Sequence, residues 1–187
     1  MQPSVLTDGT VVLSVPDSGD VDAITEGCRD AEVAAWTTVP HPYSRTDAVR
    51  FVEDIVPSKW ADGLPDWGIR IGTDGPLLGM IGFVQHGSGA PEIGFWMAPG
   101  ARGRGVATAA ARLVCDFAFA REGLHTWRVE WRALVGNVPS AAVARRLGFR
   151  YEGVARHGTL QRGTPRDVWV AALLPDDPRE PADGWPI

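Results

Sequence analysis

The chain has 187 residues, of which 44% are hydrophobic and 22% charged, and its formal net charge is −5. This length suggests one domain, and the composition is that of a globular protein rather than a disordered chain. The acidic balance lacks the broad positive field of a general nucleic-acid binder. Cys28 and Cys115 lie far apart without a Cys-x-x-Cys pair or a neighbouring His, so no metal site is expected.

The sequence contains no run of the roughly 18 apolar residues that a membrane-spanning helix needs. Residues 1–10 have no basic segment followed by an apolar run, so a leader peptide is not expected. The chain is therefore expected to work in the cytoplasm, without a membrane partner.

Periodicity and turn residues predict a mixed order of strands and helices. Ser44 stands three residues before Asp47, which resembles a capping box and predicts the start of a helix. Asp74-Gly75 between two apolar runs is a strong hairpin signal. The expected strands cover residues 10–15, 66–72, 77–84, 92–97, 127–133, 149–154 and 167–174. The expected helices cover residues 20–34, 44–56, 104–121 and 138–147.

This order predicts an α/β fold in one domain over residues 1–174. Residues 175–187 are rich in Pro and Asp and show no periodicity. They are expected to form a surface-lying or disordered tail.

The segment Arg102-Gly103-Arg104-Gly105-Val106-Ala107 joins an apolar strand to a helix with one apolar face. Glycine lets the backbone approach a ligand closely, and a helix N-terminus offers unpaired N–H groups and partial positive charge. A strand, glycine loop and helix in this order are therefore suited to a pyrophosphate group. The two arginines would add positive charge.

Two familiar nucleotide-binding motifs do not fit this segment. The dinucleotide fingerprint requires a third Gly, and Thr108 stands at that position. The P-loop requires a Lys after its last Gly, and Lys59 is the only Lys in the chain. From the residues alone, the segment is either a phosphate-binding loop or a tight structural turn.

The segment does match the pyrophosphate motif of the GNAT superfamily, which is Gln or Arg, two residues, Gly, one residue, and Gly or Ala. Arg102, Gly105 and Ala107 occupy the three defined positions. Residues 92–97 resemble the family's fourth strand, and further matches follow at the expected spacing: Asn137, Ser140, Val143, Arg146 and residues 147–149. Over about residues 10–174 the chain resembles GNAT N-acetyltransferases.

This resemblance implies a mixed, mostly antiparallel twisted sheet of about six or seven strands flanked by about four helices. The fourth and fifth expected strands would splay apart. It also implies acetyl-coenzyme A (acetyl-CoA) as cosubstrate. The splay would leave unpaired backbone groups that hold the pantetheine arm near Met97 and Ala98. Main-chain N–H groups would hold the pyrophosphate along the loop formed by Arg102, Gly103, Arg104, Gly105, Val106, Ala107 and Thr108.

The nearest branch resembles the RimJ/RimL-type ribosomal-protein N-terminal acetyltransferases. The supporting residues are Trp36, Pro40, Pro42, Tyr43, Trp67, Glu152-Gly153 and Arg166-Asp167. Trp36, Tyr43 and Trp67 are candidates for the wall of an acceptor pocket, with packing in the core as the alternative. The implied acceptor is a protein N-terminus or a small-molecule amine, and a homodimer is expected by analogy with the family.

Ser140 occupies the position from which related enzymes are thought to protonate the departing thiolate. A hydroxyl within hydrogen-bond reach lowers the cost of the developing negative charge. The alternative is a polar residue in the first turn of a helix. Asn137 precedes Val138-Pro139 and is expected to cap this helix and to contact the pantetheine. Arg146 faces either the phosphates of the coenzyme or the solvent.

Glu92, at the start of the splayed strand, is the candidate general base, with a salt-bridged strand-end carboxylate as the alternative. The carboxylate expected in the closest relatives aligns with Thr159, which cannot act as a base at neutral pH. Lone histidines are more often surface residues than catalysts. The four in this chain are scattered and lie mostly in expected loops: His41, His86, His125 and His157.

The leading hypothesis is an N-acyltransferase that transfers acetyl directly to a neutral amine in a ternary complex. The departure at Thr159 keeps open a second hypothesis, a catalytically weak or inactive acyl-CoA sensor with the same fold. A nucleotide-binding interaction module is a third, and Thr108 disfavours it.

Overall fold

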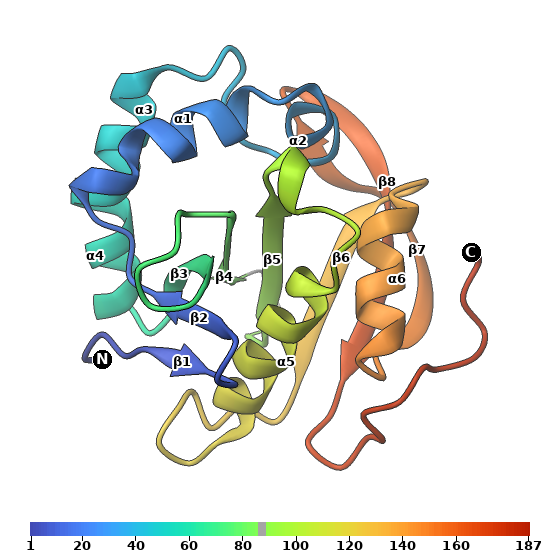
Figure 1. The fold of residues 1–187 in the computed structure, drawn as a ribbon. Helices are drawn as coiled ribbons and strands as arrows, with labels where there is room; N and C mark the ends of the chain where they lie inside the picture. The colour runs from blue at the N-terminus through green and yellow to red at the C-terminus, as the bar shows by residue number, and fades with distance from the viewer. Residues whose placement is uncertain (86–88) are drawn as a thin grey trace. The chain divides into compact units, whose positions relative to one another are not determined.

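The computed structural model describes residues 1–85 and 89–187. The chain divides into two compact units, Met1–Phe83 with Phe95–Val114 and Val84–Gly94 with Cys115–Ile187. Within the described residues, eight strands and several helices confirm the predicted α/β class (Figure 1). His86, at the start of an expected turn, lies outside the described residues.

The first unit contains four consecutive antiparallel strands. Their inward side chains are almost fully buried: Leu13, Trp67, Ile69 and Ile81. This burial explains why the sequences of these strands either alternate apolar and polar residues or are continuously apolar. The predicted antiparallel pairing on either side of Asp74-Gly75 is confirmed, but the paired residues end at Ile69 and Gly79, so the connection is longer than the expected turn. A short first strand was not predicted. The strands, in hydrogen-bonding order, are β1 (Leu6–Thr7), β2 (Val11–Ser14), β3 (Asp66–Ile71) and β4 (Gly79–Gln85).

The single helix predicted over residues 20–34 is wrong, because the chain forms α1 (Val21–Arg29) and α2 (Ala31–Trp36). Asp30 lies between them in a non-helical conformation, with φ −58° and ψ 134°. Its side chain accepts a hydrogen bond from the Val33 N–H and so caps α2. An Asp that competes for backbone donors ends one helix and starts the next.

The second predicted helix begins as expected, with Ser44 and Asp47 forming a capping box. It continues beyond residue 56 as α3 (Arg45–Arg50), a π-helical turn (Phe51–Ile55) and α4 (Val56–Ala61). The Val56 N–H donates to the Phe51 carbonyl, five residues earlier. Pro57 then falls in the first turn of α4, where its missing N–H is tolerated, and so the proline does not end the helix.

The second unit contains the start of β5 (Pro91–Met97), β6 (Val129–Leu134), α6 (Val138–Arg146), β7 (Arg150–Gln161) and β8 (Thr164–Leu173). β6 pairs with β8, and β8 pairs with β7, in both cases antiparallel. β5 and β6 are parallel and are paired at Glu92 and Glu130, near the start of each strand. The predicted splay beyond this paired position stays a prediction.

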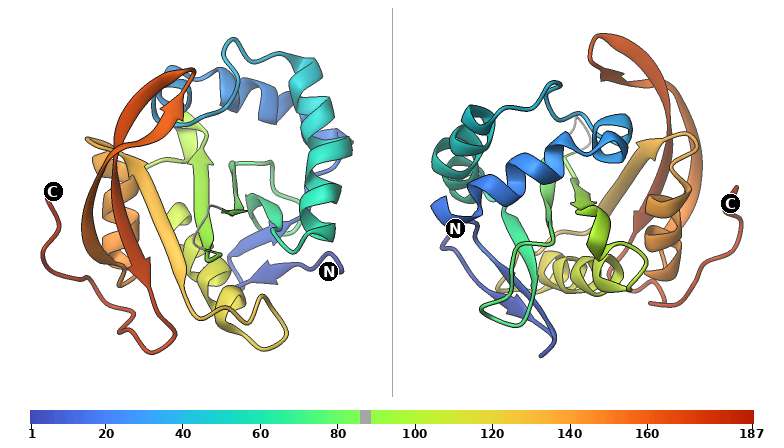
Figure 2. Two further views of the ribbon diagram at one scale, coloured as in Figure 1. Left: turned by 180° about the vertical axis from the view of Figure 1, so that it is seen from behind. Right: turned by 45° about the horizontal axis from the view of Figure 1, so that its top comes forward.

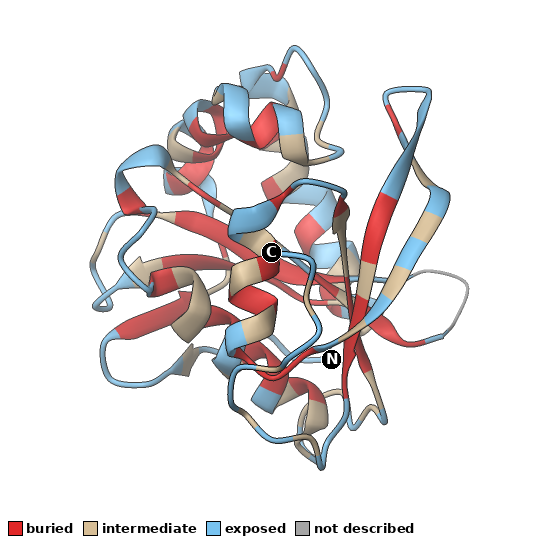
Figure 3. Ribbon diagram, turned by 90° about the vertical axis from the view of Figure 1, so that its right-hand side faces the viewer, coloured by how far each residue is buried: buried red, intermediate tan, exposed pale blue. Residues whose placement is uncertain are grey.

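β7 is twice as long as the strand expected over residues 149–154, because it continues into a hairpin with β8 (Figure 2). Arg162 and Gly163 have φ 48° and 79° at the turn, as two-residue hairpins of the primed type require. Exposed and half-buried residues alternate along most of β7, as Figure 3 shows. Residues 175–187 form neither helix nor strand.

Candidate functional site

The glycine loop leads into α5 (Val106–Phe119). Two glycines of the loop have backbone angles in the left-handed region. Gly103 has φ 71° and Gly105 has φ 78°, conformations that L side chains rarely adopt. A Cβ added at either glycine would meet no atom within 4 Å, so the space in front of the loop is open. Only glycine gives this backbone shape without filling that space.

Gly105 also occupies the N-cap of α5, because the Ala109 N–H donates to its carbonyl at 3.1 Å. A glycine has no side-chain oxygen with which to cap the N–H groups of Val106, Ala107 and Thr108. Those first-turn donors have no partner within the helix, and no acidic residue stands in that turn. The loop can therefore receive an anionic group through main-chain N–H donors and the positive end of the helix dipole.

The Arg102 side chain holds the loop in place. Its Nε donates to the Met97 carbonyl at 3.0 Å, and its guanidinium pairs with the Asp30 carboxylate. This hydrogen bond holds the pKa of Asp30 below its usual range. Arg102 therefore ties the loop to the break between α1 and α2. Arg102 and Arg104 are both exposed residues.

β5 ends at Met97, and Ala98 follows it just before the loop. The Ala98 N–H donates to the Leu78 carbonyl at 2.8 Å, and the Met97 carbonyl already accepts from Arg102. A Cβ on Gly79 would lie 2.2 Å from the Trp96 carbonyl, which shows how closely β4 approaches the end of β5. Both polar groups of the Met97–Ala98 peptide are therefore hydrogen-bonded, which corrects the expectation of unpaired backbone groups at this peptide.

In the second unit, Asn137 is the N-cap of α6. Its side-chain oxygen accepts the Ser140 N–H at 3.3 Å, and Pro139 falls in the first turn. The capping role predicted for Asn137 is confirmed, while its predicted contact with pantetheine stays a prediction. Arg146, in the last turn, is exposed.

The Ser140 hydroxyl lies beside the buried indole of Trp131. Trp131 Nε1 donates to Ser140 Oγ at 3.1 Å. Because an indole N–H can only donate, this bond uses a lone pair of Oγ and leaves the hydroxyl proton for another acceptor. A donor at Oγ also favours negative charge on that oxygen. The Ser140 hydroxyl proton is therefore not used by the bond to Trp131.

Glu92 lies at the paired start of β5, and its side chain is 13% exposed. Burial raises the pKa of Glu92 to about 7, with a further upward contribution from the Glu130 carboxylate and a downward one from Arg132. Arg132 Nε lies 3.8 Å from Glu92 Oε2, and its guanidinium also donates to the Gly158 carbonyl at 2.7 Å. A carboxyl group with such a pKa can accept and release a proton near neutral pH.

Residues of the proposed branch motif form contacts of their own within the second unit. Arg128 donates to both carboxylate oxygens of Glu152, at 2.9 and 2.6 Å, and to Glu130 at 3.2 Å. Thr159 stands opposite Arg166 in the β7–β8 ladder. His157 has φ 49° in the bulge of β7, where its backbone N–H donates to Asp167. His157 is an exposed residue.

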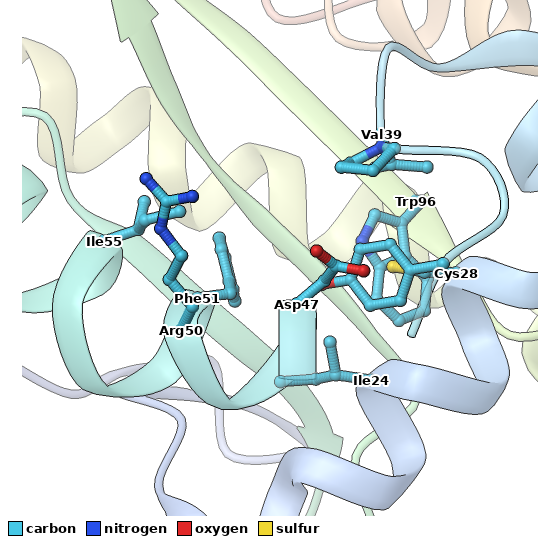
Figure 4. A pocket seen from close by; sticks show the side chains of 10 residues that line it. Ile24, Cys28, Val39, Asp47, Arg50, Phe51, Ile55 and Trp96 are labelled. Atoms are coloured by element: carbon cyan, nitrogen blue, oxygen red, sulfur yellow. The ribbon is translucent and has the colours of Figure 1, made fainter. Parts of the chain in front are cut away.

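The first unit also contains a cavity of about 160 Å³ beside the π-helical turn (Figure 4). Its wall is mostly apolar and comes from α1, the loop between α2 and α3, the π-helical turn and β5: Ile24, Cys28, Tyr43, Phe51, Ile55 and Trp96. Asp47 and Arg50 place a carboxylate and a guanidinium at the same cavity. A Cβ on Gly27 would lie 2.3 Å from the Trp96 ring, so α1 fixes that wall.

Of the three aromatic residues predicted for the acceptor pocket, Tyr43 lines this cavity. Trp67 is fully buried, donates to the Ser4 carbonyl at 2.8 Å and packs edge-on against Trp60. Trp36 donates to Glu32 at 3.0 Å. The core alternative therefore describes Trp67 better, and Trp36 does not line the cavity.

The predicted site residues fall into two groups by unit. Met97, Ala98, the glycine loop and Tyr43 belong to the first unit. Glu92, Asn137, Ser140 and Arg146 belong to the second. Sequence reasoning missed Trp131 and Arg132, which contact Ser140 and Glu92. Both are consecutive residues of a strand, and only the strand register shows which side chains they meet.

A family profile described as the acetyltransferase (GNAT) domain matches residues 10–150, three quarters of the chain. The chain belongs to the GNAT acetyltransferase family. No helix in the described part of this GNAT chain has the length and apolar character needed to span a bilayer.

Named relatives support the RimJ/RimL-like branch of this GNAT family. YdaF of Bacillus subtilis (strain 168), whose name describes a ribosomal N-acetyltransferase, is 39% identical over 123 residues. That match covers 59% of this chain and 66% of YdaF, so the chain spans just under two thirds of that relative. A solved acetyltransferase structure is 30% identical with a TM-score of 0.77, covering 93% of this chain and 98% of its own.

The fold is also that of RimL, a ribosomal L7/L12 α-N-protein acetyltransferase solved in complex with coenzyme A. The TM-score is 0.78 at 21% identity, covering 91% of this chain and 98% of that one. The predicted fold class and the membership of the N-acetyltransferase family are therefore confirmed.

Proposed function

We propose that this protein transfers an acetyl group from acetyl-CoA to a primary amine, either a protein N-terminus or a small-molecule amine. The observation that carries the proposal is the open glycine loop at the N-terminus of α5 in a GNAT chain, with φ 71° at Gly103 and 78° at Gly105. The structural neighbour RimL was solved with coenzyme A, which supports the same cosubstrate here.

The loop residues would bind the pyrophosphate of acetyl-CoA. The N–H groups of the first turn of α5 would donate to it, and Arg104 would supply positive charge. Arg102 would act through the shape of the loop, because its guanidinium is held by Asp30 and Met97. Met97 and Ala98 would lie along the pantetheine, with Asn137 and Arg146 as further coenzyme contacts from α6.

Glu92 would act as the general base and Ser140 as the general acid. The neutral amine nitrogen attacks the thioester carbonyl carbon, a C–N bond forms, and the C–S bond breaks. Glu92 accepts the proton that the nitrogen loses, and Ser140 donates its hydroxyl proton to the departing thiolate sulfur. Water then reprotonates Ser140 and deprotonates Glu92, so protons and charge balance over the cycle.

The cavity beside the π-helical turn would hold a side chain of the acceptor. Ligand sites for whole small molecules usually exceed about 300 Å³, whereas a cavity of about 150 Å³ can hold a benzene molecule. A cavity of about 160 Å³ therefore fits one aromatic or branched aliphatic side chain. Burial raises the pKa of Cys28 to about 12, so its thiol contributes an apolar surface rather than a nucleophile.

Incubation with acetyl-CoA and a panel of amines should show acetyl addition to at least one acceptor. The panel should contain peptides with free α-amines, a lysine peptide blocked at its N-terminus, polyamines and amine antibiotics. Mass spectrometry would detect the added acetyl group, and free coenzyme A would be measured in parallel. Tight binding of acetyl-CoA without transfer to any of these amines would favour the alternative function, an acyl-CoA sensor.

Ser140→Ala should lower kcat by about 10²-fold, the low end for loss of a general acid, because water can replace the hydroxyl in part. The KM for acetyl-CoA should change little. Ser140→Thr, which keeps a hydroxyl group, is the matched control and should retain most of the activity. A decrease in kcat well below tenfold for Ser140→Ala would return Ser140 to a structural role in the first turn of α6.

A further inference from the structure

The tail 175–187, expected to lie on the surface or be disordered, is anchored to α6 and the start of β7. The Ala182 N–H donates to the Arg145 carbonyl at 3.2 Å, and Arg145 Nε donates back to the Ala182 carbonyl at 3.2 Å. Asp177 pairs with Arg150 at 2.9 Å. These contacts hold the tail against the helix that carries Ser140.

The backbone of the tail also packs directly on the turn between α6 and β7. Gly148 has φ 89° there, and a Cβ built on it would lie 2.0 Å from the Pro178 carbonyl oxygen. A side chain at this position would push the tail away. The turn is therefore shaped to receive the tail.

Trp185, near the end of the tail, is held at three points. Its indole N–H donates to the Phe149 carbonyl at 3.1 Å. Its ring packs against Trp131, with centroids 5.3 Å apart and planes at 62°, and against Tyr151 at 5.7 Å. Edge-on packing of this kind is a favourable geometry for aromatic pairs.

The ring of Trp131 therefore contacts Trp185 while its N–H donates to Ser140 Oγ. We propose that Trp185 is a positioning residue for acetyl transfer, which fixes the Trp131 indole and thereby directs the Ser140 hydroxyl proton. This inference rests on the proposed function, because it assigns Ser140 the role of general acid.

The physical reason is the freedom of a serine hydroxyl. The Ser140 side chain has three staggered rotamers and a freely rotating O–H, and the single donor bond from Trp131 selects among them. If Trp185 is removed, Trp131 loses its aromatic neighbour and can change its χ2 angle. The bond to Oγ is then made for only part of the time, and fewer encounters place the proton on the thiolate.

Trp185→Leu should lower kcat on the order of tenfold, and by no more than the loss caused by Ser140→Ala. The KM for acetyl-CoA should stay within about twofold, because the glycine loop is untouched. Trp185→Phe, which keeps an aromatic ring, should recover most of the activity. Trp127→Leu is the matched control, since Trp127 is 64% exposed and should leave kcat unchanged.

A double-mutant cycle separates positioning from a general loss of stability. In the Ser140→Ala background, Trp185→Leu should cause no further decrease in kcat, because the group that it positions is gone. The same decrease in both backgrounds would overturn the proposal. An unchanged kcat for Trp185→Leu in the wild-type background would overturn it as well.

Hydrogen exchange of the Trp131 indole N–H tests the geometry without any acetyl transfer. The signal is assigned by its loss in Trp131→Phe and should be protected in the wild type. Trp185→Leu should increase its exchange rate at least tenfold, while Trp127→Leu should not. If no amine is acetylated, the proposed function fails, and unchanged protection in Trp185→Leu would separately overturn the positioning role.

Discussion

Glu92→Gln should lower the kcat for acetyl transfer at pH 7 by about 10²-fold or more, because loss of a general base costs about 10²–10⁴-fold. The substitution keeps the size of the side chain and removes its ability to accept a proton. The effect should be larger for a lysine-like acceptor than for an α-amine. An amine with a pKa near 10.4 is almost wholly charged at pH 7, whereas one near 7.7–8.0 is partly neutral.

The pH dependence of the transfer rate tests whether Glu92 is the group that accepts the proton. Burial raises the pKa of Glu92 to about 7, so the wild-type rate should rise as pH increases through that value and Glu92 becomes a base. In Glu92→Gln the inflection near 7 should disappear, and only the titration of the acceptor should remain. Alkaline pH should therefore restore much of the lost rate.

Glu130→Gln is the matched control, because Glu130 lies opposite Glu92 in the β5–β6 register. The Glu130 carboxylate raises the pKa of Glu92, so its neutralisation should move the inflection to lower pH and leave the base in place. An unchanged rate and pH profile in Glu92→Gln, with acetyl-CoA binding intact, would show that Glu92 is not the base.

The same pKa shift has a consequence for stability. A carboxyl group whose pKa rises on folding binds its proton more tightly in the folded protein. Its contribution to the free energy of unfolding is complete below about pH 4.5 and is lost as pH rises through about 7. This loss is roughly 3 kcal/mol. Relative to the wild type, Glu92→Gln should become more stable as pH rises from 4 to 8 in urea unfolding.

The glycine loop could be predicted from sequence because its features are local. Gly103 and Gly105 take positive φ, and α5 begins directly after them. The caps at Ser44 and Asn137 are also local, and both were predicted. Hydrogen bonds between residues three apart in sequence can be recognised without knowledge of the fold.

Other features depend on contacts between distant residues. Asp30 breaks the first predicted helix, and its partner Arg102 is 72 residues away. Trp185 meets Trp131 through the tail, in a segment whose composition indicates disorder. The length of β7 depends on pairing with β8 around Arg162-Gly163, a turn without the usual Asn-Gly or Asp-Gly pair. None of these contacts has a local sequence signal.

The glycine loop as the site of acetyl-CoA binding is the central claim, and Gly105→Trp tests it most directly. Gly105 has φ 78°, and the space where its side chain would project holds no protein atom within 4 Å. An indole there would occupy the place assigned to the pyrophosphate. Gly163→Trp is the matched control, because Gly163 has φ 79° and lies in the β7–β8 turn. A Cβ added at Gly163 would also meet no protein atom within 4 Å. Both variants carry the same backbone strain.

Thermal unfolding with and without acetyl-CoA gives the decisive comparison. At about 100 times Kd, a ligand that binds only the folded state adds about 2.7 kcal/mol, which raises Tm by about 5–10 °C for a chain of this size. The wild type and Gly163→Trp should show this shift, and Gly105→Trp should remain folded and show none. A folded Gly105→Trp protein that binds acetyl-CoA as tightly as the wild type would contradict the assignment of this loop.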